Sequence, residues 1–212
     1  SDSDEPRYAG IGSFSLSGTN CHLVLQDAVH DKTATATPRH TATQPQMLVL
    51  SARSEALLQQ TAQRYLDFIN TEQPDLIHLC FTAAQGREQH DVRAAIIVES
   101  LDEAKAALKT LAALKTLAAV SAENIVTKQQ DSENALTGSK LDKQAKALTD
   151  AFNPEQTTFD ELKTVANSYV QGARIQWQAL YAEADRQRVH LPAQPFKSEA
   201  FWLLPVRRVQ VS

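Results

Sequence analysis

The sequence predicts a mixed α+β fold, in which a small three-stranded sheet is packed by helices. An N-terminal β-hairpin precedes this domain, and an extended C-terminal segment wraps over it. Short apolar runs at residues 47–52, 92–99 and 124–127 are typical of strands. Between them, apolar residues recur at the spacing of amphipathic helices. Only 6 glycines and 6% aromatic residues in 212 argue against an all-β sandwich.

Residues 1–27 contain the predicted hairpin. Two strand-like runs flank a turn rich in serine and glycine at residues 15–19. Residues 28–46 are rich in Thr, Ala, Pro and His and have almost no apolar periodicity, so they predict a linker.

The first half of the α/β domain begins with a buried strand at residues 47–52. Ser54 then follows as a plausible N-cap for an amphipathic helix. Pro74 marks the start of a shorter helix, and Gly86 marks its end. The run at residues 92–99 predicts a strand buried on both faces.

A capping box at residues 100–103 starts the next helix. This helix contains a tandem repeat, because Leu-Lys-Thr-Leu-Ala-Ala occurs at residues 108–113 and again at 114–119. At about 100° per residue, the second copy is rotated by about 240° and cannot continue the same apolar face. We therefore expect strong packing to end near residue 113, with a weak third strand at residues 124–127.

Residues 128–146 are polar and without periodicity, which predicts a loop. A second capping box, from Thr158 to Glu161, starts a helix that ends near Gly172, and residues 174–177 predict a short strand. The expected organisation is a hairpin at 1–27, a linker at 28–46, an α/β domain at 47–127, a polar insert at 128–155 and a helix with a wrapping tail at 156–212.

Prolines shape the expected C-terminal segment at residues 188–196. Because Pro192 and Pro195 lack backbone donors, the segment cannot be a central strand. We expect it to lie across a surface and dock by its side chains.

The composition excludes several classes of protein. The formal net charge is -4 and the 21 basic residues are scattered, which argues against a nucleic-acid partner. No apolar run approaches the roughly 18 residues of a membrane-spanning helix, and the acidic N-terminus does not resemble a signal peptide. Cys21 and Cys80 both lie in apolar patterns, which predicts buried free thiols. These features favour a cytoplasmic globular protein.

Three segments carry a family resemblance. Residues 7–25, R-Y-A-G-I-G-S-F-S-L-S-G-T-N-C-H-L-V-L, resemble the last hairpin of a thiolase-fold ketosynthase, the condensing enzyme of polyketide and fatty-acid synthases. L-V-L-S-A-R-S at 48–54 and A-A-Q-G-R at 83–87 resemble the domain linking ketosynthase to acyltransferase. G-A-R-I-Q-W-Q-A-L-Y at 172–181 and R-V-H-L-P-A-Q-P-F-K-S-E-A-F-W at 188–202 resemble the segment that follows the acyltransferase in modular polyketide synthases.

The acyltransferase itself is missing from this pattern. Its nucleophile motif, G-H-S-x-G, does not occur, and residues 128–155 are too few to hold that domain. The arrangement resembles synthases of the trans-acyltransferase type, whose acyltransferase is a separate protein. The resemblance implies a noncatalytic structural or docking module of a modular polyketide synthase, with no bound cofactor. Its partners would be the ketosynthase body, an acyl carrier protein bearing phosphopantetheine and, as a further candidate, a trans-acting acyltransferase.

Two other interpretations stay open. The chain could be the C-terminal piece of a ketosynthase that another chain completes for acyl transfer and decarboxylative condensation. It could also be an assembly module whose polar insert at 128–155 mediates lateral contacts between synthases.

The resemblance also assigns roles to single residues. The backbone N–H of Leu16 would help form the oxyanion hole of a complete ketosynthase, next to Ser15, which stands where the family has glycine. His22 would be a buried structural histidine, and no catalytic residue is expected in the chain alone. No metal site is expected, because His78 and Cys80 have no second pair of ligands. The expected docking anchors are Trp177, Tyr181, Pro195, Phe196, Phe201 and Trp202.

Overall fold

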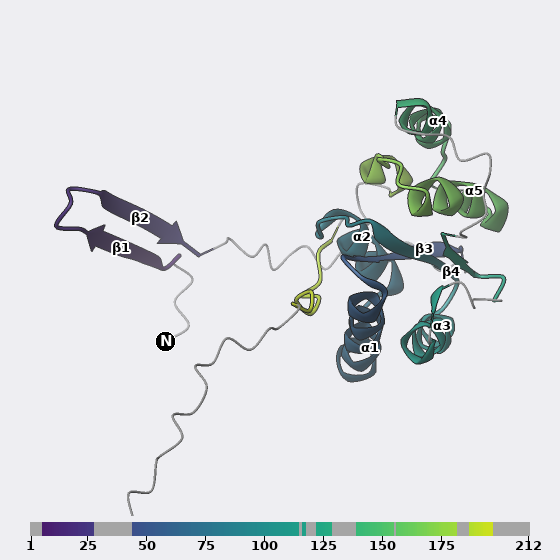
Figure 1. The fold of residues 1–212 in the computed structure, drawn as a ribbon, viewed down its shortest axis with the longest axis horizontal. Coiled ribbons are helices and arrows are strands. Elements are labelled where there is room, and N and C mark those ends of the chain that lie inside the picture. Colours follow the sequence, from purple (N-terminus) through teal and green to yellow (C-terminus); the bar gives the residue numbers. More distant parts are fainter. Residues whose placement is uncertain are drawn as a thin grey trace, which may run out of the picture. The chain divides into compact units, whose positions relative to one another are not determined.

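A computed structural model describes residues 6–27, 44–114, 116–117, 122–128, 139–154, 156–181 and 187–196. The chain divides into two units, Ser1–Arg39 and His40–Ser212. The mixed α+β class is confirmed (Figure 1). In order, the elements are β1 (Tyr8–Phe14), β2 (Asn20–Gln26), β3 (Gln46–Ala52), α1 (Glu55–Glu72), α2 (Leu76–Gln85), β4 (Val92–Val98), α3 (Leu101–Ala113), β5 (Ile125–Thr127), α4 (Ser139–Asp150), α5 (Phe159–Val170) and the 3-10 turn η2 (Trp177–Leu180).

The first unit is the predicted hairpin. β1 and β2 pair antiparallel, with Gly12 opposite His22, and Gly18 takes a positive φ of 85° in the turn between them. Both strands are exposed along their whole length, so the expected burial of Cys21 and His22 is wrong for this unit. The physical reason is that a two-stranded hairpin has no second layer with which to cover its own faces.

The second unit is built on a three-stranded antiparallel sheet in the order β3-β4-β5. β4 is central, and its Ala95 lies opposite Val49 of β3 and Val126 of β5. Figure 1 shows α1 and α3 on one side of this sheet and α5 on the other, in agreement with their contacts. Because helices cover both faces, the last five residues of β4 are all buried, as the apolar run predicts.

Local hydrogen bonds start the helices largely where the sequence predicts. Ser54 caps α1, and the Thr158–Glu161 capping box at the start of α5 is complete. α2 begins at Leu76, two residues after the expected start at Pro74, and Asp75 is its N-cap. At α3, Ser100 accepts the N–H of Glu103, but the Glu103 carboxylate accepts the N–H of Glu99 instead of closing the box.

The tandem repeat ends its helix where the geometry predicts, but the expectation that strong packing ends near residue 113 is wrong, because Leu117 of the second copy is buried in the core. α3 ends at Ala113, and Leu114 is extended, with φ -67° and ψ 142°. Leu108 and Leu111 of the first copy are buried in the core. The helix therefore stops where the second copy would turn its lysine toward the core.

Two predictions in the C-terminal half are wrong. Part of the polar insert forms a helix, α4, which buries a narrow stripe made by Leu141, Ala145 and Thr149. The predicted strand at residues 174–177 is coil followed by η2, and the N–H of Arg174 donates to Asp142 of α4 at 2.9 Å rather than to a neighbouring strand. These two segments contact each other, so neither structure could be predicted from its own residues. None of the helices in the described ranges has the length and apolarity needed to cross a bilayer.

Candidate docking site

An extended segment at residues 187–196, hereafter the strap, crosses the surface of the second unit without forming a helix or strand. Leu191 and Pro195 are buried, whereas Arg188, His190 and Ala193 are exposed. Pro192 and Pro195 have no N–H to donate, so the strap cannot bind as a regular strand. The expectation that this segment lies across a surface is confirmed.

Arg87, just after α2, is the principal contact of the strap. Its Nη2 donates to the carbonyl oxygens of Leu191 at 2.7 Å and Pro192 at 3.1 Å, and its Nη1 donates to Gly86 O at 3.2 Å. Its Nε is buried and has no hydrogen-bond partner among the described residues. Burial raises the pKa of the adjacent Tyr65, and Arg87 partly offsets that rise. The half-buried Arg87 guanidinium thus binds two successive carbonyls of the strap.

Side chains from two helices hold the strap on either side of Arg87. Arg64 of α1 donates to Ala193 O at 2.8 Å. The Thr82 hydroxyl of α2 accepts a hydrogen bond from the Val189 N–H at 3.0 Å and donates one to His78 O at 2.7 Å. These contacts go to the strap backbone, so the prediction that the strap docks through its side chains is only partly right.

Side-chain contacts fix the end of the strap. The Gln194 amide oxygen lies 3.1 Å from Nε2 of His90, and the Gln194 amide nitrogen donates to Glu88 O at 3.4 Å. The Ser51 hydroxyl binds the same loop, because it donates to Glu88 O at 3.3 Å and accepts the His90 N–H at 3.0 Å. The strap is therefore tied to the end of β3 through the loop that precedes β4.

A second polar cluster joins α5 to the sheet. Arg93 of β4 donates to His90 O at 2.7 Å and to the carbonyls of Tyr169 and Ala173, each at 3.0 Å. Its guanidinium lies 5.0 Å from the centre of the Tyr169 ring. The Tyr169 hydroxyl reaches Gln89 Oε1, and burial raises the pKa of Tyr169 well above its ordinary value of 10.0. Arg93 thus occupies the C-terminus of α5, where free carbonyls favour a cation.

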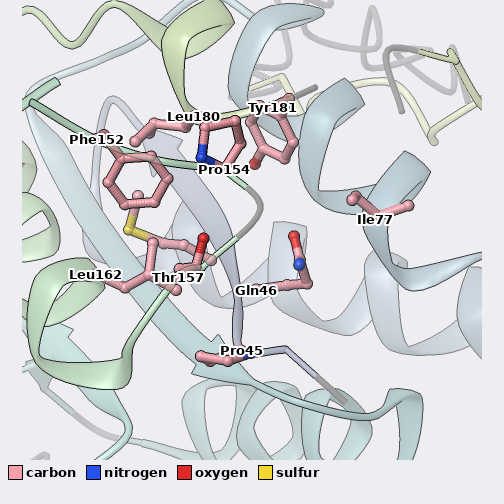
Figure 2. A pocket seen from close by; sticks show the side chains of 10 residues that line it. Pro45, Gln46, Ile77, Phe152, Pro154, Thr157, Leu162, Leu180 and Tyr181 are labelled. Carbon is pink, nitrogen blue, oxygen red and sulfur yellow. The ribbon is translucent and has the colours of Figure 1, made fainter. Parts of the chain in front are cut away.

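Two cavities lie next to these elements. A groove of about 790 Å³ runs between the start of α1 and the end of the strap, and its lining includes Arg53, Leu57, His90 and Phe196. A small pocket of about 10 Å³, enough for roughly one water, is lined mainly by apolar residues. Figure 2 shows its labelled side chains, which are Pro45, Gln46, Ile77, Phe152, Pro154, Thr157, Leu162, Leu180 and Tyr181. Neither lining includes a cysteine.

The predicted docking anchors differ in their surroundings. Tyr181 is buried and meets Phe81 edge-on at 5.4 Å, and half-buried Trp177 meets Tyr169 edge-on at 5.3 Å. The structure thus packs these two side chains, with Pro195, against their own domain. Phe196 is 88% exposed. Phe201 and Trp202 lie outside the described residues. Binding of another protein by this set stays a prediction.

The turn of the hairpin contains Leu16 and Ser15, the two residues related by resemblance to a ketosynthase oxyanion hole. Leu16 projects fully into solvent from the turn. Ser15 stands where the family has glycine, but its backbone does not adopt a positive φ. Among the described non-glycine residues, only Gln73 has a positive φ, so Ser15 is not strained in this way. The Leu16 backbone role stays a prediction.

The thiols and possible metal ligands can also be placed. Both cysteines are free, but Cys21 is exposed, whereas Cys80 is fully buried and its thiol pKa is raised by that burial. Within the described part of the chain, no three His, Cys, Asp or Glu side chains lie together as metal ligands would. The contacts that sequence reasoning missed are those of Arg87 and Arg93. For Arg87, the A-A-Q-G-R match was the available signal.

Comparison with known proteins agrees with the predicted resemblance. Residues 46–108 match the family model described as CurL-like, PKS C-terminal. Over 201 residues, the chain is 32% identical to polyketide synthase PksL and 30% identical to polyketide synthase PksM, both of Bacillus subtilis (strain 168). These alignments cover 94% and 93% of this chain but only 4% of each relative.

Solved structures show a similar fold. The ketosynthase from module 6 of the bacillaene synthase from Bacillus subtilis 168 aligns with a TM-score of 0.57 and 26% identity, over 96% of this chain and 33% of that one. The ketosynthase from module 1 of the bacillaene synthase from Bacillus amyloliquefaciens FZB42 has a TM-score of 0.60 over 93% of this chain and 31% of that one. At 22% identity, it supports the fold alone.

Proposed function

This chain belongs to the polyketide synthases, as a C-terminal region related to ketosynthases, and on that premise we propose that it works as a noncatalytic structural and docking module. It would hold the ketosynthase body, an acyl carrier protein and a trans-acting acyltransferase in workable positions in the cytoplasm. The observation that carries the proposal is the return of the strap across the α/β domain, where Arg87 and Arg64 fix it. A tail tied to a packed domain keeps a fixed geometry, which is what a spacer between catalytic domains needs.

The use of the polar side chains supports this role. Arg87, Arg93 and Ser51 bind backbone groups of neighbouring segments, and Tyr169 is bound by Gln89. These contacts join neighbouring elements, and the Ser51 and Tyr169 hydroxyls bind carbonyl or amide oxygens rather than a base that could activate them. Cys80 is sealed in the core, where burial keeps it a thiol.

The proposal assigns the chemistry to the partners. Phosphopantetheine would be carried by the acyl carrier protein and would present the acyl chain to the ketosynthase body. The exposed Phe196, beside the groove at the start of α1, is the described anchor best placed to meet a partner.

A second function is favoured by the exposed hairpin, which could complete a ketosynthase formed with another chain. Its strands and turn display large apolar side chains, a composition typical of strands that belong to a larger sheet. These residues are Tyr8, Ile11, Phe14, Leu16, Leu23, Val24 and Leu25. In that case the Leu16 N–H would donate to the oxyanion of the acyl-transfer step.

Incubation of the purified chain with a radiolabelled malonyl or acyl thioester tests the proposal. We expect no transfer above the blank. Transfer that disappears in Cys21→Ala or another single nucleophile variant would overturn the structural role. Adding a ketosynthase body that lacks its own last hairpin distinguishes the second function, because only that function predicts that condensation is restored.

A further inference from the structure

The domain holds the strap in the way that peptide-binding domains hold extended ligands. Side chains at three places in the domain bind the strap backbone. They are Arg64 on α1, Thr82 on α2 and Arg87 after α2. Main-chain contacts of this kind supply affinity in recognition of extended peptides, and pockets for particular side chains supply the choice of sequence.

Two buried side chains of the strap make the site selective for peptide sequence. Leu191 and Pro195 are buried while their neighbours Arg188, His190 and Ala193 stay exposed. The prolines at 192 and 195 hold φ near -65°, so a free segment already favours an extended form and loses less entropy on binding. The Gln194 side chain adds contacts to His90 and Glu88. The recognised pattern is therefore leucine, proline, a variable residue, glutamine and a second proline.

Arg87 is the residue that fits this ligand most closely. Its Nη2 reaches two successive carbonyls, Leu191 O at 2.7 Å and Pro192 O at 3.1 Å. Without the strap, these donors would lose two acceptors in a site where the Arg87 Nε is already buried and unpaired among the described residues. A guanidinium in this position is built to hold a backbone, whatever side chains that backbone carries.

We propose that residues 44–181 form a binding site for extended Leu-Pro-x-Gln-Pro peptides, which the strap fills in cis and which the strap of a second copy can fill in trans. The contacts described above lie within residues 189–195, so the covalent connection contributes only a high local concentration. The inference is independent of the proposed function, because a structural module could hold either a permanent or an exchangeable strap.

The test uses the full chain with residues 182–186 replaced by a protease site. After cleavage, a fluorescein-labelled peptide of residues 187–196 is added and its anisotropy measured. We expect saturable binding that the unlabelled peptide reverses, and little binding to the uncut chain, whose site is occupied. The Arg87→Ala chain should bind at least about tenfold more weakly, since two charge-assisted hydrogen bonds are lost.

Matched variants separate recognition from general instability. Arg174→Ala removes an exposed arginine beside α4 and should leave the affinity unchanged. If Arg87→Ala does not fold, peptides carrying Leu191→Asp or Pro195→Asp answer the same question on the wild-type domain, and both should fail to bind. No binding of the wild-type peptide to the cleaved chain, or equal binding of the Leu191→Asp peptide, overturns the proposal.

Discussion

Replacement of Arg93 by methionine would show how strongly α5 depends on the sheet. Methionine keeps an unbranched apolar stem but removes the guanidinium. In the native protein that group donates to His90 O at 2.7 Å and to Tyr169 O and Ala173 O at 3.0 Å, and it lies 5.0 Å from the Tyr169 ring centre. The substitution therefore cuts three links between β4, its preceding loop and the end of α5.

The expected cost follows from these contacts. A hydrogen bond from a charged donor contributes about 1.5–3 kcal/mol, and an arginine over an aromatic ring about 0.5–1 kcal/mol. Arg93 is half-buried, so water can replace part of what is lost, and the contributions do not add. We expect the free energy of unfolding to fall by about 3 kcal/mol.

Urea unfolding followed by circular dichroism at the helix signal measures this change. With a slope of about 2 kcal/mol per molar, the midpoint should fall by about 1.5 M. Arg53→Met is the matched control, because Arg53 is exposed, and should change stability by less than about 0.5 kcal/mol. If Arg93→Met behaves like this control, the three hydrogen bonds do not stabilise α5 and the reasoning fails.

Three further predictions concern local features. Gln73 ends α1 in the left-handed region at φ 44°, which is strained for a residue with a Cβ. Gln73→Gly should therefore raise the free energy of unfolding by about 0.5–1 kcal/mol in the same assay, and a fall would show that Gln73 is not strained. Cys21 should react with a thiol reagent in the native protein, and Cys80 only after unfolding, because Cys80 is buried and its pKa is raised. Fast reaction of both thiols in the native protein would contradict the burial of Cys80. Hydrogen bonds from Thr158 lower the pKa of Glu161 below its ordinary value of 4.5. The advantage of the wild type over Glu161→Gln should therefore be present above pH 4.5 and fade as the pH falls below it. Thermal unfolding across this range measures that advantage, and an equal advantage at about pH 2 would refute the assignment.

Features that depend on short stretches of chain were predictable from the sequence. Ser54 and Thr158 cap their helices because the acceptor and the N–H lie three residues apart. α3 ends at Ala113 because a continued helix would bring the lysine of the second copy onto its apolar face. The buried run at β4 was recognisable because both its faces require apolar residues.

Features that depend on a neighbouring surface were not predictable in this way. α4 was missed because its buried stripe of Leu141, Ala145 and Thr149 is narrow and packs beside Ala173, a residue of a later segment. Cys21 has the same apolar pattern as a buried strand, yet whether a strand is covered depends on a second layer and not on its own residues.

The sequence by itself determined the α+β class, most element boundaries, the family resemblance and the extended form of the strap, because capping, periodicity and proline chemistry act over a few residues. Only the tertiary structure showed what holds the strap. Arg87 reaches the carbonyls of Leu191 and Pro192 across 104 and 105 residues of chain. Tyr181 and Trp177, which look like exposed anchors in the sequence, turn inward against Phe81 and Tyr169. Backbone carbonyls carry no sequence signal, and the burial of an aromatic ring depends on what the fold places over it.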